Sequence, residues 1–460
     1  MTARMAEESQ LLPTSHELAC DSSSTRVDDS THQLDALVVV PHLGAGGTQR
    51  VVTLLLDHWC EAGWRIGILT LFATPDSYPL HSRVYREDFM VAADGLETHP
   101  LRQVNRRIEA ALAHFSDRGS PLRSALVLPL LAAFRALRQS VVTAVTAVSP
   151  NLAERFVRGK REVRWLRSRF SALHPRVVVS FLGATNIQTV LAAEGLKVPV
   201  LISERNDPAI QHLGQPWQTL RKRVYARADM VTANSLGALE TLSRWVAPER
   251  LSRVHNPLAM PPPPSAMDRS TERLVLVARL VPQKGVDLLI DAFARVAGEL
   301  GRWQLDLVGD GPLRTTLMER AQRFGLSDRI VFHGHQSDPF PYLYRASIFV
   351  LPSRFEGMPN ALLEAMGAGL AIIVTDASPG PLEFITNGET GIVVPADNAG
   401  ALATAIYTLC MDAALRVRLA TASQGLAASM ALPSVASQWE TIISNTIANR
   451  GPSQKSAVNA

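Results

Sequence analysis

Cysteine is scarce in this chain. Its 460 residues include only three cysteines, Cys20, Cys60 and Cys410, which lie far apart and have no close-set histidine partners. Such a small, odd and scattered set supports neither a disulfide framework nor a zinc cluster. We therefore expect the protein to belong to a reducing compartment.

Long hydrophobic runs are also missing. The most apolar stretch, residues 126–148, is interrupted by Pro129, Arg135, Arg138 and Gln139. It falls short of the run of about 20 apolar residues that a spanning helix needs, so we predict no transmembrane helix. Residues 1–10 lack an apolar core and residues 11–31 are polar, so we expect no targeting segment and a disordered tail over residues 1–33.

Charged residues make up 19% of the chain, below the usual share of about 25%. Their distribution is uneven, because residues 1–35 hold seven acids and two bases, whereas residues 101–176 hold fifteen Lys or Arg and four acids. The second segment has a helical pattern with arginines at every third position, namely Arg155, Arg158, Arg161, Arg164 and Arg167. On one helix they would form a spiral of roughly 240°. Such a helix is either a solvated cover of the N-terminal sheet or a contact surface for acidic lipid or a phosphorylated acceptor.

Short aliphatic runs alternate with helical patterns along most of the chain, as in parallel α/β folds. In the first half they cover residues 36–40, 66–72, 177–182, 200–203 and 230–233. In the second half they cover residues 274–277, 304–308, 330–332, 348–351, 371–375 and 392–394. Most are continuously apolar, which is typical of strands covered by helices on both faces.

A Pro-rich stretch at residues 259–270 divides these two sets of strands and reads as a stiff linker. We predict an α/β fold of two Rossmann-like, doubly wound domains that face a cleft. The N-terminal domain would cover residues 34–258 with a basic helical insertion at about 101–176, and the C-terminal domain residues 271–430, followed by a helix and tail at residues 431–460. Ligands of such sheets bind at the carboxyl ends of the strands.

The loop after the first predicted strand, residues 41–48, contains Gly44, Gly46 and Gly47 ahead of a helix that begins near Gln49. Glycines in this position let backbone amides approach an anion or a hydroxyl closely. The spacing is not that of the dinucleotide fingerprint, and a tight structural turn is the alternative.

Two cations follow the strand at residues 274–277 and precede a helix predicted over residues 286–295. Arg279 offers a planar fork of donors and Lys284 a compact charge, at a place where a diphosphate would fit. Ordinary surface charges are the alternative.

Residues 353–367 form the sharpest constellation. Glu356 lies in the loop after the strand at residues 348–351, and Glu364 lies eight residues later on the buried side of a helix predicted over residues 360–366. Carboxylates placed in this way accept hydrogen bonds from sugar hydroxyls. The alternative is a capped helix with Glu364 in an internal ion pair.

This Glu, seven residues, Glu pattern with the upstream Arg279 and Lys284 resembles the retaining family-four glycosyltransferases of the GT-B fold (glycosyltransferase group 1), of the kind that builds bacterial surface or lipid-linked glycans. The resemblance covers about residues 35–445. It includes residues 44–47, 309–312, 332–334 and 388–391.

The resemblance implies roles by position. Arg279 and Lys284 would hold the donor diphosphate, Glu364 would bind the ribose hydroxyls, and Glu356 would lie by the transferred sugar; Glu356, Arg279 and Lys284 are the expected catalytic residues. The other expected substrate-binding residues are Gly46, Gly47, Glu204, Arg205, Asn206, Asn256, His333, Gly334, Gly357, Met358, Pro359 and Asn360.

Within that set, the amides of residues 357–360 would contact sugar or phosphate, and the segment around His333 and Gly334 would meet the base. Gly46 and Gly47 would close over the donor from the N-terminal acceptor domain. Residues 203–208 look like an acceptor-facing motif of related enzymes, with a capped turn before Pro208 as the alternative. Residues 378–383 resemble a loop of members that use N-acetylhexosamines.

We therefore predict a retaining glycosyltransferase that moves a hexose or N-acetylhexosamine from a nucleotide diphosphate sugar, with UDP favoured, to a glycan or lipid-linked acceptor. We expect no metal, because no Asp-x-Asp cluster follows a strand and two cations can neutralise the leaving diphosphate. No cofactor is expected beyond the nucleotide sugar, which is a co-substrate, and no nucleic acid partner.

The predicted location is cytoplasmic, with peripheral contact to the inner membrane through residues 101–176. A GT-B epimerase or phosphorylase is one alternative function. A non-catalytic carbohydrate or membrane scaffold is another, although the intact Glu356, Glu364, Arg279 and Lys284 argue against it.

Overall fold

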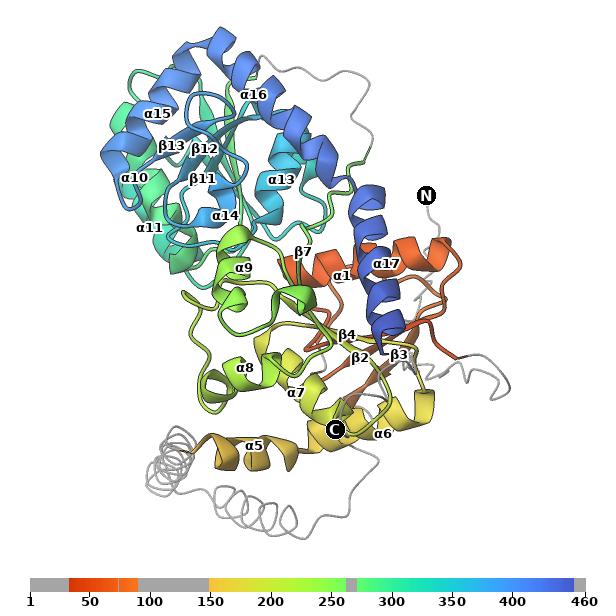
Figure 1. The fold of residues 1–460 in the computed structure, drawn as a ribbon. Helices are drawn as coiled ribbons and strands as arrows, with labels where there is room; N and C mark the ends of the chain where they lie inside the picture. Colours follow the sequence, from red (N-terminus) through yellow and green to blue (C-terminus); the bar gives the residue numbers. More distant parts are fainter. Residues whose placement is uncertain (1–32, 73, 90–148, 262–270, 451–460) are drawn as a thin grey trace, which may run out of the picture. The chain divides into compact units, whose positions relative to one another are not determined.

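The computed structural model of the protein describes residues 33–72, 74–89, 149–261 and 271–450. Nearly all of the predicted N-terminal tail, most of the Pro-rich linker and residues 101–148 of the basic insertion lie outside these ranges. The described residues form two parallel sheets with helices on both faces (Figure 1), so the predicted pair of doubly wound sheets is confirmed.

The first sheet has the strand order β3-β2-β1-β4-β5-β6-β7. Its strands are β1 (Ala36–Val40), β2 (Ile66–Thr70), β3 (Tyr85–Asp88), β4 (Val178–Phe181), β5 (Val200–Glu204), β6 (Met230–Ala233) and β7 (Leu251–Arg253). The helices between them are α1 (Gly47–Glu61), α5 (Pro150–Arg158), α6 (Arg161–Leu173), α7 (Gly183–Ala193), α8 (Trp217–Tyr225), α9 (Leu236–Ser243) and the short η1 (Pro248–Arg250).

The second sheet has the order β10-β9-β8-β11-β12-β13. Its strands are β8 (Arg273–Val277), β9 (Gln304–Val308), β10 (Ile330–Gly334), β11 (Ile348–Leu351), β12 (Ala371–Thr375) and β13 (Ile392–Val394). Its helices are η2 (Pro282–Lys284), α10 (Val286–Val296), α11 (Arg314–Arg323), α12 (Phe340–Tyr344), α13 (Asn360–Gly367), α14 (Pro379–Leu382), α15 (Ala399–Met411), α16 (Ala413–Ala427) and η3 (Ala428–Met430), and the last helix of the chain is α17 (Leu432–Asn449).

Alternate residues of the inner strands enter different hydrophobic cores. In β1, Leu37 and Val39 pack in the core that contains α5 to α9, whereas Val38 and Val40 pack in the core that contains α1 and α17. In β11, Ile348 and Val350 likewise face α10 and α15, while the intervening residues face α12 and α13. Two-sided burial explains why these strands are apolar without interruption.

The chain returns to the first sheet at its end. Leu258, in the segment that leads out of the first sheet, pairs with residues 430–432, which lead back to it. The Leu258 amide donates to the Met430 carbonyl (2.7 Å), and the Leu258 carbonyl accepts from the Leu432 amide (2.9 Å). Helix α17 then packs on the face that also carries α1, with Trp439 against Phe181 at a ring-centroid distance of 5.6 Å. The predicted C-terminal helix is therefore part of the first core.

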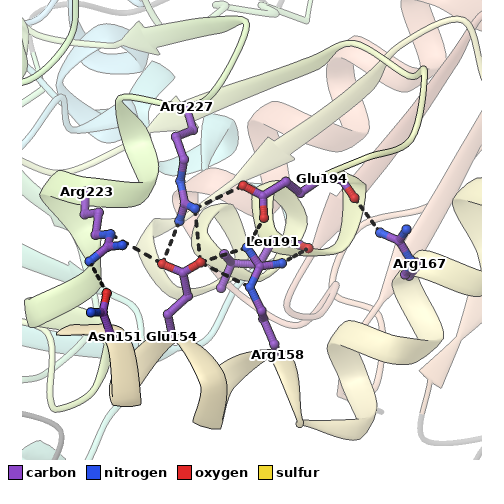
Figure 2. Close-up of polar contacts among 8 residues, drawn as sticks. All are labelled: Asn151, Glu154, Arg158, Arg167, Leu191, Glu194, Arg223 and Arg227. Atoms are coloured by element: carbon purple, nitrogen blue, oxygen red, sulfur yellow. Dashed lines mark hydrogen bonds and ion pairs between the residues drawn. The ribbon is translucent and has the colours of Figure 1, made fainter. Parts of the chain in front are cut away.

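The prediction of one arginine-rich helix is wrong. The helix ends at Arg158, Gly159 and Lys160 form a break, and α6 starts at Arg161. Arg158 donates to Glu154 (2.8 Å) and to Glu194 at the end of α7, and Arg167 donates to the Glu194 carbonyl (2.6 Å), as Figure 2 shows. These arginines fasten α5 and α6 onto α7, which favours a cover of the sheet over a continuous cationic spiral.

Within the described residues, no single helix is long and apolar enough to cross a membrane. The segments Ala399–Met411 and Ala413–Met430 meet the length and composition requirement only as a pair, and they are bent by 102° at the break between them.

Candidate active site

Two loops meet at the middle of the second sheet. Strands β8 and β11 are neighbours, but the chain runs from β8 outward to β9 and β10, and from β11 outward to β12 and β13. The carboxyl ends of β8 and β11 therefore flank the point where the winding reverses, the usual ligand position in open α/β sheets. The loops that follow these strands carry Arg279 and Lys284 on one side and Glu356 on the other.

Gly285 allows the two loops to touch. Its φ of 60° lies in the left-handed region, and a Cβ atom there would lie 2.0 Å from the Pro352 carbonyl oxygen. The contact is extended by backbone and side-chain bonds, since the Arg354 amide donates to the Gln283 carbonyl (2.8 Å) and Gln283 Nε2 donates to the Phe355 carbonyl (3.0 Å). The sequence thus needs glycine at this position to bring Lys284 beside Glu356.

Lys284 and Glu356 form an ion pair in which the carboxylate is buried and the ammonium is partly exposed. The Lys284 ammonium lies 2.6 Å from Glu356 Oε1, which also accepts from the Ser353 hydroxyl (2.6 Å). The Glu356 amide donates to the Ser378 hydroxyl (2.8 Å), which fixes the backbone at the same point. The predicted catalytic carboxylate and its predicted cationic neighbour are therefore brought together, with Glu356 8% exposed.

Arg279 differs from Lys284. Its side chain is exposed and makes no ion pair or hydrogen bond with the described residues. The backbone around it is closely supported, because a Cβ at Gly309 would lie 1.9 Å from the Ala278 carbonyl and one at Gly311 would lie 2.5 Å from the Leu280 carbonyl. A guanidinium with free donors thus stands on the closely packed loop that leads from β8 to Lys284.

Helix α13 carries the second carboxylate. Glu364 is 5% exposed, and its Oε1 lies 3.3 Å from Nε of Arg50, which belongs to α1 of the first sheet. Burial raises the pKa of Glu364, while the Arg50 guanidinium opposes the rise and Asp338 adds to it. The alternative of an ion-paired Glu364 is therefore observed, and its partner comes from the other sheet.

Asn360, at the start of α13, connects the two sheets. Its Nδ2 donates to the Gly47 carbonyl (3.0 Å), and its Oδ1 accepts from Asn256 Nδ2. Asn256 Nδ2 also donates to the Met358 carbonyl (3.0 Å). The predicted residues Gly47, Asn256, Met358 and Asn360 thus share one set of contacts, with Gly46 next to Gly47 and Pro359 between the last two.

On the side of the first sheet, Arg205 contacts Asn256 of this set. Its guanidinium donates to Asn256 Oδ1, and its Nε is buried without a partner among the described residues. Burial lowers the pKa of Arg205 to about 10, so it remains a cation at neutral pH. A Cβ on Gly357 would lie 2.8 Å from the Arg205 carbonyl, which shows how closely the two loops pack.

Glu204 has a different environment from that expected of a substrate contact. It is completely buried, its Oε2 accepts from Arg221 (2.7 Å) and Tyr225 (2.7 Å), and its Oε1 accepts from the Arg205 amide (3.0 Å). Direct contact of Glu204 with substrate stays a prediction, while these bonds favour a role in holding the Arg205–Asn206 backbone. Asp207 caps the following turn through the Ala209 amide (2.9 Å).

His333 and Gly334 lie at the end of β10, away from the Lys284–Glu356 pair in the strand order. Nε2 of His333 contacts Oδ1 of the fully buried Asp306 (2.7 Å), and the ring packs 4.6 Å from that of Tyr342. Gly334 has a φ of 71°, and its carbonyl accepts from the Gly309 amide (2.8 Å). Contact of this segment with a base stays a prediction.

Several contacts escaped the sequence reasoning. Arg50 follows the glycine loop by three residues, and Arg221 and Tyr225 lie on α8 with no spacing that links them to Glu204. Ser353 and Ser378 lie in segments that the sequence singles out, but no local pattern predicts that both would bond to Glu356. The described residues contain no group of three His, Cys, Asp or Glu side chains that could hold a metal ion.

A groove in the described part of the chain lies away from this site. It is lined by Gly367 at the end of α13 and by residues of the crossover to α17, including Met260, Ala428 and Pro433. None of the predicted site residues lines it.

Comparison with known proteins bears directly on this site. Residues 271–412 match the family described as Glycosyl transferases group 1. The chain is 26% identical to the N-acetylgalactosamine-N,N'-diacetylbacillosaminyl-diphospho-undecaprenol 4-alpha-N-acetylgalactosaminyltransferase of Campylobacter jejuni, over 51% of this chain and 67% of that protein. It is 32% identical to the lipopolysaccharide 1,6-galactosyltransferase of Salmonella typhimurium, over 36% of this chain and 47% of that protein.

The chain spans 20% of the length of a curated exopolysaccharide phosphotransferase of Streptomyces coelicolor and 67% of the Campylobacter jejuni relative. Among solved structures, Anabaena HepE in complex with UDP and glucose aligns with a TM-score of 0.67 at 16% identity, over 90% of this chain and all of that one. Staphylococcus aureus TarM, in a complex that contains UDP, aligns with a TM-score of 0.66 at 11% identity, over 89% of this chain and all of that one. The fold is GT-B, as predicted.

Proposed function

We propose that this chain transfers a hexose or N-acetylhexosamine from a nucleotide diphosphate sugar to a glycan or lipid-linked acceptor, because residues 271–412 match the family described as Glycosyl transferases group 1. UDP is the favoured nucleotide, in keeping with the UDP complexes of the two GT-B structures above. The observation that carries the proposal is the pairing of Lys284 with Glu356 at the winding reversal of the second sheet, on a loop that also carries the free guanidinium of Arg279.

The two cations suit a leaving diphosphate. Arg279 has free donors, and the Lys284 ammonium keeps donors beyond the one that Glu356 accepts. Fixed positive charge at this point stabilises the negative charge that develops as the sugar–phosphate bond breaks. We propose that the reaction therefore proceeds without a metal and without a cofactor other than the nucleotide sugar.

Glu356 is proposed to act beside the transferred sugar. Its carboxylate is held by Lys284 and Ser353, and its amide by Ser378, so its position is set before a sugar arrives. A fixed negative charge there would stabilise an oxocarbenium-like centre. We propose retention of anomeric configuration, with the acceptor attacking from the face that the diphosphate leaves.

The acceptor is proposed to meet the first-sheet loops. Arg205 is a buried cation without a direct carboxylate partner among the described residues, and Asn256 links it to Met358. The names of the two relatives point to a diphospho-undecaprenol-linked glycan and to lipopolysaccharide, which supports a glycan or lipid-linked acceptor here.

We further propose that the protein is cytoplasmic and contacts the inner face of a membrane through α5. Leu152 and Phe156, one helical turn apart, are 43% and 40% exposed, and Arg155 beside them is exposed. The Lys160 ammonium lies 5.7 Å from the Phe156 ring. Apolar side chains flanked by cations suit the surface of an anionic bilayer.

An epimerase or phosphorylase of the same fold is the alternative activity. Both enzymes would use the same cations, Arg279 and Lys284, to bind the nucleotide diphosphate or the phosphate. An epimerase releases or converts a nucleotide sugar without an acceptor, and a phosphorylase requires inorganic phosphate.

The test is a panel of nucleotide sugars measured by thermal stabilisation and by nucleotide release. A donor that binds the folded state raises the melting temperature, and release should then require a glycan acceptor. Acceptor-independent conversion would favour an epimerase, and dependence on phosphate a phosphorylase. If no nucleotide sugar stabilises the protein, the proposed function fails.

A further inference from the structure

Arg50 and Glu364 connect the two sheets through their side chains. Arg50 lies in the first turn of α1, Glu364 lies in α13, and the distance from Nε to Oε1 is 3.3 Å. The side chains are 19% and 7% exposed, so water screens the pair only in part. Nothing in the spacing of the sequence joins these two residues.

The starts of the two helices are held in register. Asn360, the first residue of α13, donates to the carbonyl of Gly47, the first residue of α1. Arg50 is three residues after Gly47 and Glu364 is four residues after Asn360, so both side chains lie one turn into their helices and on the facing sides. The ion pair is therefore a consequence of how the two helix starts meet.

Glu364 depends on this cation. Among the described residues, Arg50 makes the one ion pair to the Glu364 carboxylate. Asp338, exposed two residues before α12, is a nearby negative charge, and Tyr78 is a nearby phenol. The Arg50 guanidinium is itself held 5.6 Å from the ring of the buried Phe340. An isolated carboxylate at 5% exposure would favour its neutral form.

We propose that Arg50 is a positioning residue of the nucleotide site, which holds Glu364 in place and in its charged form so that the carboxylate can accept hydrogen bonds from the ribose hydroxyls. The inference rests on the proposed function. An ionised carboxylate offers only acceptors, whereas a protonated one gives up part of that capacity, and bonds to the charged form are the stronger ones. The nucleotide site would then include a residue of the first sheet.

The pH dependence follows from the charges around Glu364. Burial and Asp338 raise the pKa of Glu364, and Arg50 opposes them. Without Arg50 the pKa rises further, so the carboxylate takes up its proton at a higher pH. Nucleotide affinity should therefore begin to fall at a higher pH in the variant than in the parent as the solution is acidified.

The experiment is calorimetric titration of UDP from pH 5 to pH 8 into the parent, Arg50→Gln, Arg50→Lys, Glu364→Gln and the Arg50→Gln/Glu364→Gln double variant. Arg65→Gln is the matched control, because it also removes one arginine of the first sheet that pairs with a carboxylate, that of Asp35. Arg50→Met, which keeps an unbranched side chain without the charge, serves if Arg50→Gln fails to fold.

We expect Arg50→Gln to weaken UDP binding about tenfold at pH 6 with a smaller effect at pH 8, and Arg50→Lys to restore most of the affinity. In Glu364→Gln the fall of UDP affinity at acidic pH should disappear. In the double variant, the added Arg50→Gln change should lower the UDP affinity little further. Equal UDP affinity of the parent and both Arg50 variants at every pH, or full additivity with Glu364→Gln, would overturn the inference. If the parent binds UDP and the Arg50 variants bind it equally well, only this inference fails. If the parent binds neither UDP nor GDP, titrated in the same way, the proposed function fails with it.

Discussion

The Lys284 ammonium lies 2.6 Å from Oε1 of Glu356, although 72 residues separate the two in the chain. The contact exists because β8 and β11 are adjacent in the sheet and Gly285 lets their loops approach. The two groups are held together at a strand end, where one ligand could meet both. The Lys284 cation would then face the diphosphate and the Glu356 carboxylate the sugar.

Replacing either cation should weaken donor binding. We expect Arg279→Ala and Lys284→Ala each to lower the affinity for UDP about tenfold or more, since a charge-assisted hydrogen bond contributes about 1.5–3 kcal/mol. Arg279→Ala should leave the melting temperature unchanged, whereas Lys284→Ala leaves Glu356 unpaired and should lower it. Calorimetry measures the affinity, and Arg302→Ala, an exposed arginine of the same half, is the control. Parental affinity in both variants would reject the phosphate role.

The two carboxylates should respond differently to conversion into amides. Glu364→Gln should weaken nucleotide binding, because it loses charge-assisted contacts to the ribose. Glu356→Gln should chiefly lower kcat, since its charge is proposed to act on the sugar as the bond breaks. Kd from calorimetry and kcat from UDP release with an acceptor distinguish them, and parental activity in each variant contradicts the assignment.

Glu204 and Arg221 should matter for stability. Arg221→Met leaves a completely buried carboxylate without its cation and should lower the free energy of unfolding by about 3–5 kcal/mol. Urea denaturation measures this loss. Arg244→Met breaks an exposed pair with Glu240 and should cost no more than about 1 kcal/mol. If Arg221→Met unfolds at the parental urea concentration, the structural role assigned to Glu204 is wrong.

Membrane contact should depend on the exposed face of α5. Leu152→Ser with Phe156→Ser, or Arg155→Gln alone, should reduce cosedimentation with anionic vesicles and leave UDP affinity intact. Arg158 and Arg167 are poor choices for this test because both bond to α7. Binding of the parent should fall as salt rises, and neutral vesicles should bind poorly. Equal cosedimentation of parent and variants would remove α5 from the proposal.

Most of the fold could be predicted from the sequence, since each expected strand is present with ends shifted by at most two residues. The strands that escaped are β3 and β7, which lie at the edges of the first sheet. An edge strand is paired on one side only, so it can be as polar as Tyr85–Asp88 and lack the apolar run that reveals an inner strand.

The loops after the strands could be found, but their partners could not. Periodicity placed Arg279, Lys284, Glu356 and Glu364 at strand ends and a helix start, because each of these is a local feature. Arg50 meets Glu364 across 314 positions, and Arg221 meets Glu204 on a helix of ordinary pattern. Contacts of this kind depend on how two sheets and their helices pack, which a local pattern does not record.

The return of α17 makes the two halves interleaved along the chain. A fragment that stops after Leu258 would lack Val435, Trp439 and Ile443, and so would expose the face of the first sheet that they cover. Dividing the chain at a single position therefore cannot give two complete domains. Independent production of the first half would require residues 33–258 to be joined to residues 431–450, a join favoured by the adjacency of Leu258 and Ala431.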